Sequence, residues 1–176
     1  MIVASGSGSG LRVARVEAPP AWRALIVMPG ESLATSEARA VLPANYTRQD
    51  VVANIQGALL LGLAFAQGRG DLLQAAMTDR IHQPYRAAIC PLLSPLLPLA
   101  GQAGILGAAL SGAGPSVLLI VESDRIFEAR DTVEAASLPP VEIIETGFTS
   151  AGAALCWNEQ HASELHPPLV ITSAIT

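Results

Sequence analysis

The apolar residues of this chain recur with two spacings, and each spacing predicts a different kind of element. Residues 24–28, 105–110 and 117–121 are short apolar runs bounded by glycine, proline or serine, a pattern typical of buried strands. Residues 11–17 and 141–146 alternate apolar with charged side chains, as half-buried strands do. The other periodic segments repeat every three to four residues and are therefore expected to be helical.

The most regular helical segment is 48–66. Thr47 is a good N-cap for it, and Asp50 completes an acidic variant of the capping box. Gly57 and Gly62 cost helix stability, so close packing against another element is the expected reason for them. Shorter helices are predicted over 37–42, 71–81, 91–103 and 125–136, with Thr35 or Ser36, Asp71 and Asp124 as caps.

Glycine, proline and serine mark the segments expected to be irregular. Residues 1–10 end in a Ser-Gly repeat and are predicted to be a flexible loop. Residues 83–86 are expected to be extended, because proline disfavours helix at the residue before it. Residues 149–156 resemble a last strand that pairs with 141–146 in a hairpin, and Trp157 begins a loose, proline-rich tail.

This order of elements predicts an α+β domain, in which helices pack on one face of an antiparallel sheet. The chain has 176 residues, of which 51% are hydrophobic, so one domain with a sizeable core is expected. Residues 87–121 carry no charge, but their prolines and glycines exclude a single membrane-spanning helix, and no membrane partner is expected.

The charged and metal-binding residue types exclude several kinds of chemistry. The net charge of -5 argues against a nucleic-acid partner. All basic residues are arginine, so a P-loop lysine and a Schiff-base lysine are excluded, and a clamp for phosphate or carboxylate must use arginine. No metal site is predicted, since His82, His161 and His166 lack zinc spacing. Cys90 and Cys156 are expected to be buried thiols in a reducing compartment.

The glycine-rich stretch at 111–116 (SGAGPS) lies between two predicted strands and is the main candidate for chemistry. Its two glycines permit backbone angles that other residues avoid, and such a loop can point several N–H groups at an anion. A simpler interpretation is a hairpin turn that needs glycine for its shape alone.

Three segments with candidate binding residues follow one another along the chain: EARAVLP at 37–43, DRIHQPYR at 79–86 and LSGAGPSV at 110–117. In this order and spacing they resemble the homoserine kinase branch of the GHMP kinases (galactokinase, homoserine, mevalonate and phosphomevalonate kinases). The glycine segment alone indicates only the superfamily, whereas the other two segments together are much more specific to this branch. The resemblance covers residues 11–156 and implies a ferredoxin-like C-terminal domain.

The resemblance also implies a reaction. Enzymes of this branch are cytoplasmic and pass the γ-phosphoryl of ATP to the hydroxyl of L-homoserine, a step toward threonine. Arg39 and Arg86 match the family arginines that grip the substrate carboxylate, a task suited to the guanidinium fork. The loop that supports the nucleotide-phosphate loop in the family corresponds to Gly112, Ala113, Gly114 and Ser116.

The residues beside these positions have simpler expected roles. Without the resemblance, the two arginines would be interpreted as solvated surface residues. His82 is expected to be a hydrogen-bonded structural histidine, so no catalytic residue is assigned. Tyr85 is expected to pack beside the clamp, and Asp79 to pair with Arg80 or Arg86 or to lie on a helix surface.

The sequence departs from the family pattern in one large respect. The family's ATP-binding loop (P-x-x-x-G-L-G-S-S, opening a helix) and its metal-binding and amine-binding acids precede the matched region and have no counterpart here. We therefore expect a C-terminal part, inactive by itself, with ATP and Mg²⁺ held mainly by the missing half. The expected divisions are a remnant of the N-terminal domain (1–20), the GHMP kinase C-terminal domain (21–157) and a tail (158–176). Exposed apolar edges would then favour association, and a homodimer stays open.

Two other functions stay open. One is another GHMP kinase, although the QPYR segment at 83–86 argues against the acceptors of the other branches. The other is a free-standing ferredoxin-like module that binds a small amino acid or regulates in response to it.

Overall fold

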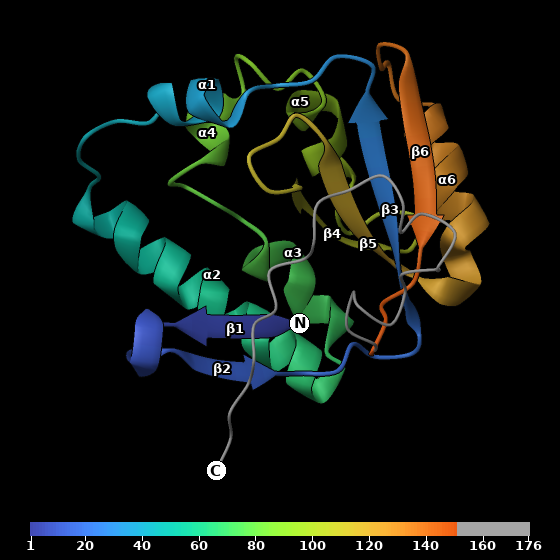
Figure 1. The fold of residues 1–176 in the computed structure, drawn as a ribbon. Helices are drawn as coiled ribbons and strands as arrows, with labels where there is room; N and C mark the ends of the chain where they lie inside the picture. Colours follow the sequence, from blue (N-terminus) through green and yellow to red (C-terminus); the bar gives the residue numbers. More distant parts are fainter. Residues whose placement is uncertain (151–176) are drawn as a thin grey trace, which may run out of the picture.

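A four-stranded antiparallel sheet forms the centre of the molecule in a computed structural model, which describes residues 1–150 (Figure 1). The strand order is β4-β5-β3-β6. The central pair, β3 and β5, is in register along its length, with Leu25 opposite Leu119. This order, with every pairing antiparallel, is the arrangement of a ferredoxin-like unit, so the predicted α+β fold is confirmed. The strands are β3 (Trp22–Pro29), β4 (Ile105–Leu110), β5 (Val117–Glu122) and β6 (Val141–Thr146).

The main core lies between one face of this sheet and two helices, α5 (Leu93–Leu96) and α6 (Ile126–Glu134). Alternate strand residues such as Leu25, Val27 and Leu119 point into it and are fully buried. The helices contribute small and branched apolar residues, which suit the close approach to the sheet. These are Leu93, Leu96, Ile126, Ala129 and Val133.

A second cluster forms where α2 (Arg48–Gln67) and α3 (Leu73–Ala76) pack beside the edge strand β4. Trp22 and Phe65 meet edge to face, with ring centroids 5.2 Å apart. Ile120 joins this cluster, whereas its neighbours in β5 point into the main core. The helices therefore do not all lie over one face: α5 and α6 cover one face, while α2 and α3 join the cluster formed by Trp22 and Ile120 on the opposite face.

Helix α2 agrees closely with its prediction. Thr47 accepts a hydrogen bond from the Asp50 N–H, as a capping box requires. A Cβ on Gly57 would lie 3.2 Å from the Ala76 carbonyl oxygen, so close packing explains this glycine. The same expectation is wrong at Gly62, where an added Cβ would meet nothing within 4 Å. Within residues 1–150, α2 is the one helix long and apolar enough to cross a membrane, a test that helices of water-soluble folds also pass.

The first ten residues are more ordered than predicted. β1 (Ile2–Ser5) and β2 (Arg12–Arg15) form an antiparallel hairpin, with a 3₁₀ turn (Gly8–Gly10) between them. The predicted strand at 11–17 is therefore confirmed over its centre, whereas the flexible loop is wrong for 2–5. The Ser-Gly repeat does form the turn, but pairing with β2 makes a strand of the apolar residues before it.

Several short helices differ from their predictions. The segment 71–81 holds a 3₁₀ turn (Gly70–Leu72) and α3, which ends at Ala76. Residues 83–86, predicted to be extended, form α4 (Gln83–Arg86). Pro84 is tolerated there because the first helical turn needs no N–H donor. The remaining helical elements are α1 (Thr35–Ala40) and the 3₁₀ turns Leu97–Leu99 and Ser123–Arg125.

Three predicted caps are wrong. α1, α3 and α6 follow Ala34, Leu72 and Arg125, and these N-cap residues make no side-chain cap hydrogen bond. The Asp71 carboxylate instead binds the guanidinium of Arg69 in two bonds. Residues 149–150 are not in a strand, and the rest of the predicted hairpin, the tail, Cys156, His161 and His166 lie outside the described residues.

Candidate functional site

Asp79 stabilises the start of the short helix α4, which carries one of the two candidate arginines. One carboxylate oxygen accepts from the Asn54 side chain at 2.6 Å and from the Ile81 N–H at 2.9 Å. The other accepts from the N–H groups of His82 and Gln83, at 2.9 and 2.7 Å. These are the donors that the start of a helix leaves without partners, so the carboxylate fixes where α4 begins.

The ionisation of Asp79 reflects these contacts. Burial raises the pKa of this carboxyl, but the hydrogen bonds from Asn54 and from the N–H groups of Gln83 and Ile81 outweigh burial and lower its pKa below the ordinary value. The carboxylate is therefore charged at neutral pH. The expectation that Asp79 pairs with Arg80 or Arg86 is wrong, because its oxygens bind backbone and amide donors.

Arg86 lies at the end of α4, and its guanidinium is held by two distant segments. Its Nε donates to the Ala38 carbonyl of α1 at 3.0 Å, and one terminal nitrogen donates to the Gly112 carbonyl at 3.4 Å. The residue is 7% exposed, and no acidic side chain within residues 1–150 pairs with it. A buried cation without a carboxylate partner is a natural receptor for an anion.

Arg39 lines the same pocket from α1. This pocket has a volume of about 560 Å³, and its walls come from α1, α4 and the loop after β4. The guanidinium of Arg39 is exposed and forms no hydrogen bond or ion pair with the described part of the chain. The structure thus brings the two predicted arginines, 47 positions apart in sequence (86 − 39), to one open cavity.

The glycine loop closes one side of this pocket through Gly112 and Ala113. Gly112 has φ +64° and Gly114 has φ +93°, so both glycines adopt left-handed backbone angles. The loop is also closed by its own bonds, from Ser111 N–H to the Ser116 carbonyl and from Gly114 N–H to the Ser111 carbonyl. The N–H groups of Gly112 and Ala113 have no partner within residues 1–150, so they are free to meet an anion.

The other two loop positions do not line the pocket. A Cβ on Gly114 would lie 2.8 Å from the Cys90 sulfur, so this glycine is required by packing. Ser116 takes part through its backbone carbonyl. Cys90 itself is a free thiol and fully buried, as predicted, and burial raises its pKa while Arg86 opposes that shift.

The neighbours of the clamp have structural contacts. The His82 ring lies 3.4 Å from the Asp79 carboxylate, which agrees with a structural histidine. Tyr85 packs edge to face on Tyr46, with centroids 5.9 Å apart. Within residues 1–150, no three histidine, cysteine, aspartate or glutamate side chains come together in a way that could hold a metal ion.

Sequence reasoning missed two residues that shape this site. Asn54 holds Asp79 from α2, and it also accepts from the Arg80 N–H at 2.8 Å. Gln83 is buried, and its side-chain oxygen accepts from the Leu110 N–H at 2.8 Å, directly before the glycine loop. Asn54 had one available signal, since it is a polar residue among the apolar positions of a predicted helix.

Comparison with known proteins supports a common fold and family. A family model described as GHMP kinases C terminal matches residues 63–137. The homoserine kinase of Solibacter usitatus is 48% identical over 123 residues, which are 69% of this chain and 40% of that protein. The homoserine kinase of Deinococcus radiodurans is 47% identical over 118 residues, 67% of this chain and 38% of that protein. The chain thus spans about two fifths of the length of these curated relatives.

Solved structures show the same fold. The crystal structure of a homoserine kinase from Cytophaga hutchinsonii matches with a TM-score of 0.68 at 22% identity, covering 77% of this chain and 44% of that one. The crystal structure of L. major mevalonate kinase in complex with R-mevalonate matches with a TM-score of 0.54 at 16% identity, covering 85% of this chain and 50% of that one. At these identities the likeness establishes the fold and leaves the substrate open.

Proposed function

We propose that this chain, which matches the family model described as GHMP kinases C terminal over residues 63–137, is the substrate-side half of a homoserine kinase. The proposed reaction transfers the γ-phosphoryl of ATP to the hydroxyl of L-homoserine and gives O-phosphohomoserine for threonine biosynthesis in the cytoplasm. The observation that carries the proposal is the shared pocket of Arg39, Arg86 and the glycine loop.

The pocket suits a small amino acid. A carboxylate can accept hydrogen bonds from both guanidinium groups, and because Arg86 is anchored to Ala38 and Gly112, its orientation is fixed before the substrate arrives. Phosphoryl transfer depends chiefly on such positioning and on neutralising negative charge.

ATP would supply the phosphoryl group. The free N–H groups of Gly112 and Ala113 fit an anionic oxygen, so the proposed role of the loop is to support the phosphate side of the site. The proposal assigns no Mg²⁺ ligand to residues 1–150, because these residues contain no suitable cluster. Gly114 and Ser116 would act by holding the shape of the loop.

The arginine pair is tested by titrating the purified chain with L-homoserine, with binding followed by NMR. We predict that Arg86→Ala and Arg39→Ala each weaken binding by roughly ten- to a hundred-fold, because each removes a charge-assisted contact of about 1.5–3 kcal/mol. Arg130→Ala is the matched control, since Arg130 pairs with Glu134 on the exposed side of α6.

A second control varies the ligand. Homoserinol keeps the amine and the hydroxyl of homoserine but lacks the carboxylate, so it should bind the wild-type chain as weakly as homoserine binds Arg86→Ala. Equal affinity for homoserine and homoserinol, or variants that bind like the wild type, would remove the basis of the clamp.

A further inference from the structure

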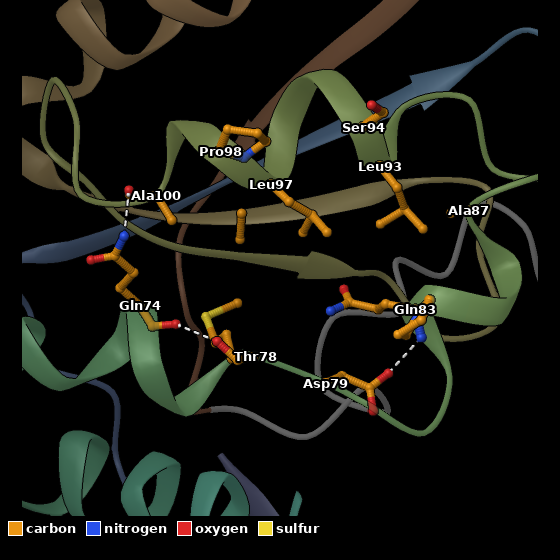
Figure 2. A pocket seen from close by; sticks show the side chains of 13 residues that line it. Gln74, Thr78, Asp79, Gln83, Ala87, Leu93, Ser94, Leu97, Pro98 and Ala100 are labelled. Atoms are coloured by element: carbon orange, nitrogen blue, oxygen red, sulfur yellow. Dashed lines mark hydrogen bonds between the residues drawn. The ribbon is translucent and has the colours of Figure 1, made fainter. Parts of the chain in front are cut away.

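A second pocket lies next to the arginine pocket and shares Asp79 and Gln83 with it. It has a volume of about 500 Å³ and opens between α3, α4, α5 and β4 (Figure 2). Nothing in the proposed kinase function uses this space.

The Gln83 side chain gives this pocket its specific chemistry. It reaches into the cavity in Figure 2 and is 7% exposed. Its oxygen accepts from the Leu110 N–H, which fixes the orientation of the amide and directs the NH₂ group elsewhere. That NH₂ group donates to no atom within residues 1–150 and is not itself closed off from solvent, so it presents an unpaired donor to the cavity.

The rest of the lining determines what kind of acceptor fits. Most of it is apolar, including Met77, Leu93, Leu97 and Ala108. The one ionised side chain in the lining is Asp79, and no arginine among the described residues balances it there. The charge of Asp79 would therefore repel an anion. A cation is also not favoured, because the oxygens of Asp79 already accept hydrogen bonds from four groups.

We propose that this pocket binds a neutral, mainly apolar small molecule whose carbonyl oxygen accepts a hydrogen bond from the Gln83 NH₂ group. Binding of this molecule also affects Leu110, because the side-chain oxygen of the same Gln83 amide accepts the hydrogen bond from the Leu110 N–H. The pocket is thus a site separate from the arginine clamp, and a ligand in it acts on the strand end from which the glycine loop begins. This inference does not depend on homoserine being the substrate.

The test uses acetophenone as the probe and the ¹⁵N-labelled, full 176-residue chain. Acetophenone should shift the Leu110 amide and the Gln83 side-chain NH₂ resonances in a saturable way. Benzoate, of similar size but anionic, and ethylbenzene, which lacks the oxygen, should each bind at least ten-fold more weakly at this pocket.

Two variants probe the pocket itself. Gln83→Glu keeps an oxygen for the Leu110 N–H but replaces the donor with a second acceptor, so acetophenone should bind at least ten-fold more weakly at neutral pH. Ala87→Leu narrows the rim without removing a hydrogen bond and should abolish the shifts. Ala88→Leu is the matched control, because Ala88 is exposed and does not line the pocket.

The outcomes separate the alternatives. Should Gln83→Glu fail to fold, Ala87→Leu and the comparison with ethylbenzene decide. Acetophenone shifts that persist in Ala87→Leu, that are matched by ethylbenzene, or that fall mainly on the exposed apolar residues of α2 would overturn the proposal.

Discussion

At the scale of single residues, Asp79 holds the start of the helix that carries Arg86. Its two oxygens accept from Asn54 and from three consecutive backbone N–H groups, and α4 with Arg86 follows directly. The local sequence around Pro84 does not favour a helix by itself. The charged Asp79 carboxylate stabilises the helix by accepting hydrogen bonds from its first N–H groups. Asp79 thereby positions Arg86, although it is not one of the two arginines of the pocket.

This role predicts a pH dependence of stability. Because the folded state lowers the pKa of Asp79 below the ordinary 3.8, its contribution is fully present above that value and is lost as the pH falls through the lower, folded pKa. We predict that Asp79→Asn lowers the free energy of unfolding by about 2 kcal/mol at neutral pH. The difference between variant and wild type should shrink below about pH 4, as measured by urea denaturation across pH.

Asp131→Asn serves as the control, since Asp131 is an exposed acid on α6. A constant difference between Asp79→Asn and wild type at every pH would contradict the proposed charge-assisted capping.

At the scale of elements, α2 is unusual because a long apolar helix has much of its apolar surface exposed. Its inner side carries Gly57 and Phe65, which pack on α3 and Trp22. Its outer side shows an apolar stripe in which the exposed fraction reaches 66% at Leu59. The members of this stripe are Val51, Val52, Ile55, Leu59 and Leu63. An exposed apolar patch of this kind is typical of a surface that another protein or domain covers.

We predict that the purified chain associates through this stripe. Replacing Ile55 and Leu59 together (Ile55→Lys, Leu59→Glu) should shift sedimentation velocity toward the monomer, because burying either charge in an apolar contact is costly. Phe127→Glu is the control: Phe127 is more exposed than any stripe residue, at 78%, but lies apart on α6. An association equal in the double variant and the wild type would place the contact elsewhere, for example on the free edges of the β1–β2 hairpin.

At the scale of the whole molecule, the fold of residues 1–150 brings the two candidate arginines and the glycine loop to one pocket. The arginines and the glycine loop share a pocket, yet the matched relatives are about two and a half times longer than the matched region. The proposed activity therefore belongs to a site completed by residues outside the described part of this chain.

We predict that the 176-residue chain binds L-homoserine but does not phosphorylate it when supplied with ATP and Mg²⁺. The measurement is ³¹P NMR of the reaction mixture over hours, with a complete homoserine kinase as the positive control. Formation of O-phosphohomoserine by the purified chain, above the rate of an Arg86→Ala sample prepared in the same way, would refute the assignment of this chain to the substrate side alone.

The sequence by itself determined the strands of the central sheet, the long helix and its cap, because these depend on apolar spacing and local hydrogen bonds that a short window contains. It also singled out Arg39 and Arg86 through motif resemblance. Only the tertiary structure decided that 83–86 is helical, that Asp79 caps it from outside, and that Gln83 links two pockets. Those features depend on partners far apart in sequence, such as Asn54 and Leu110, and the energy of such contacts exists only once the chain has folded.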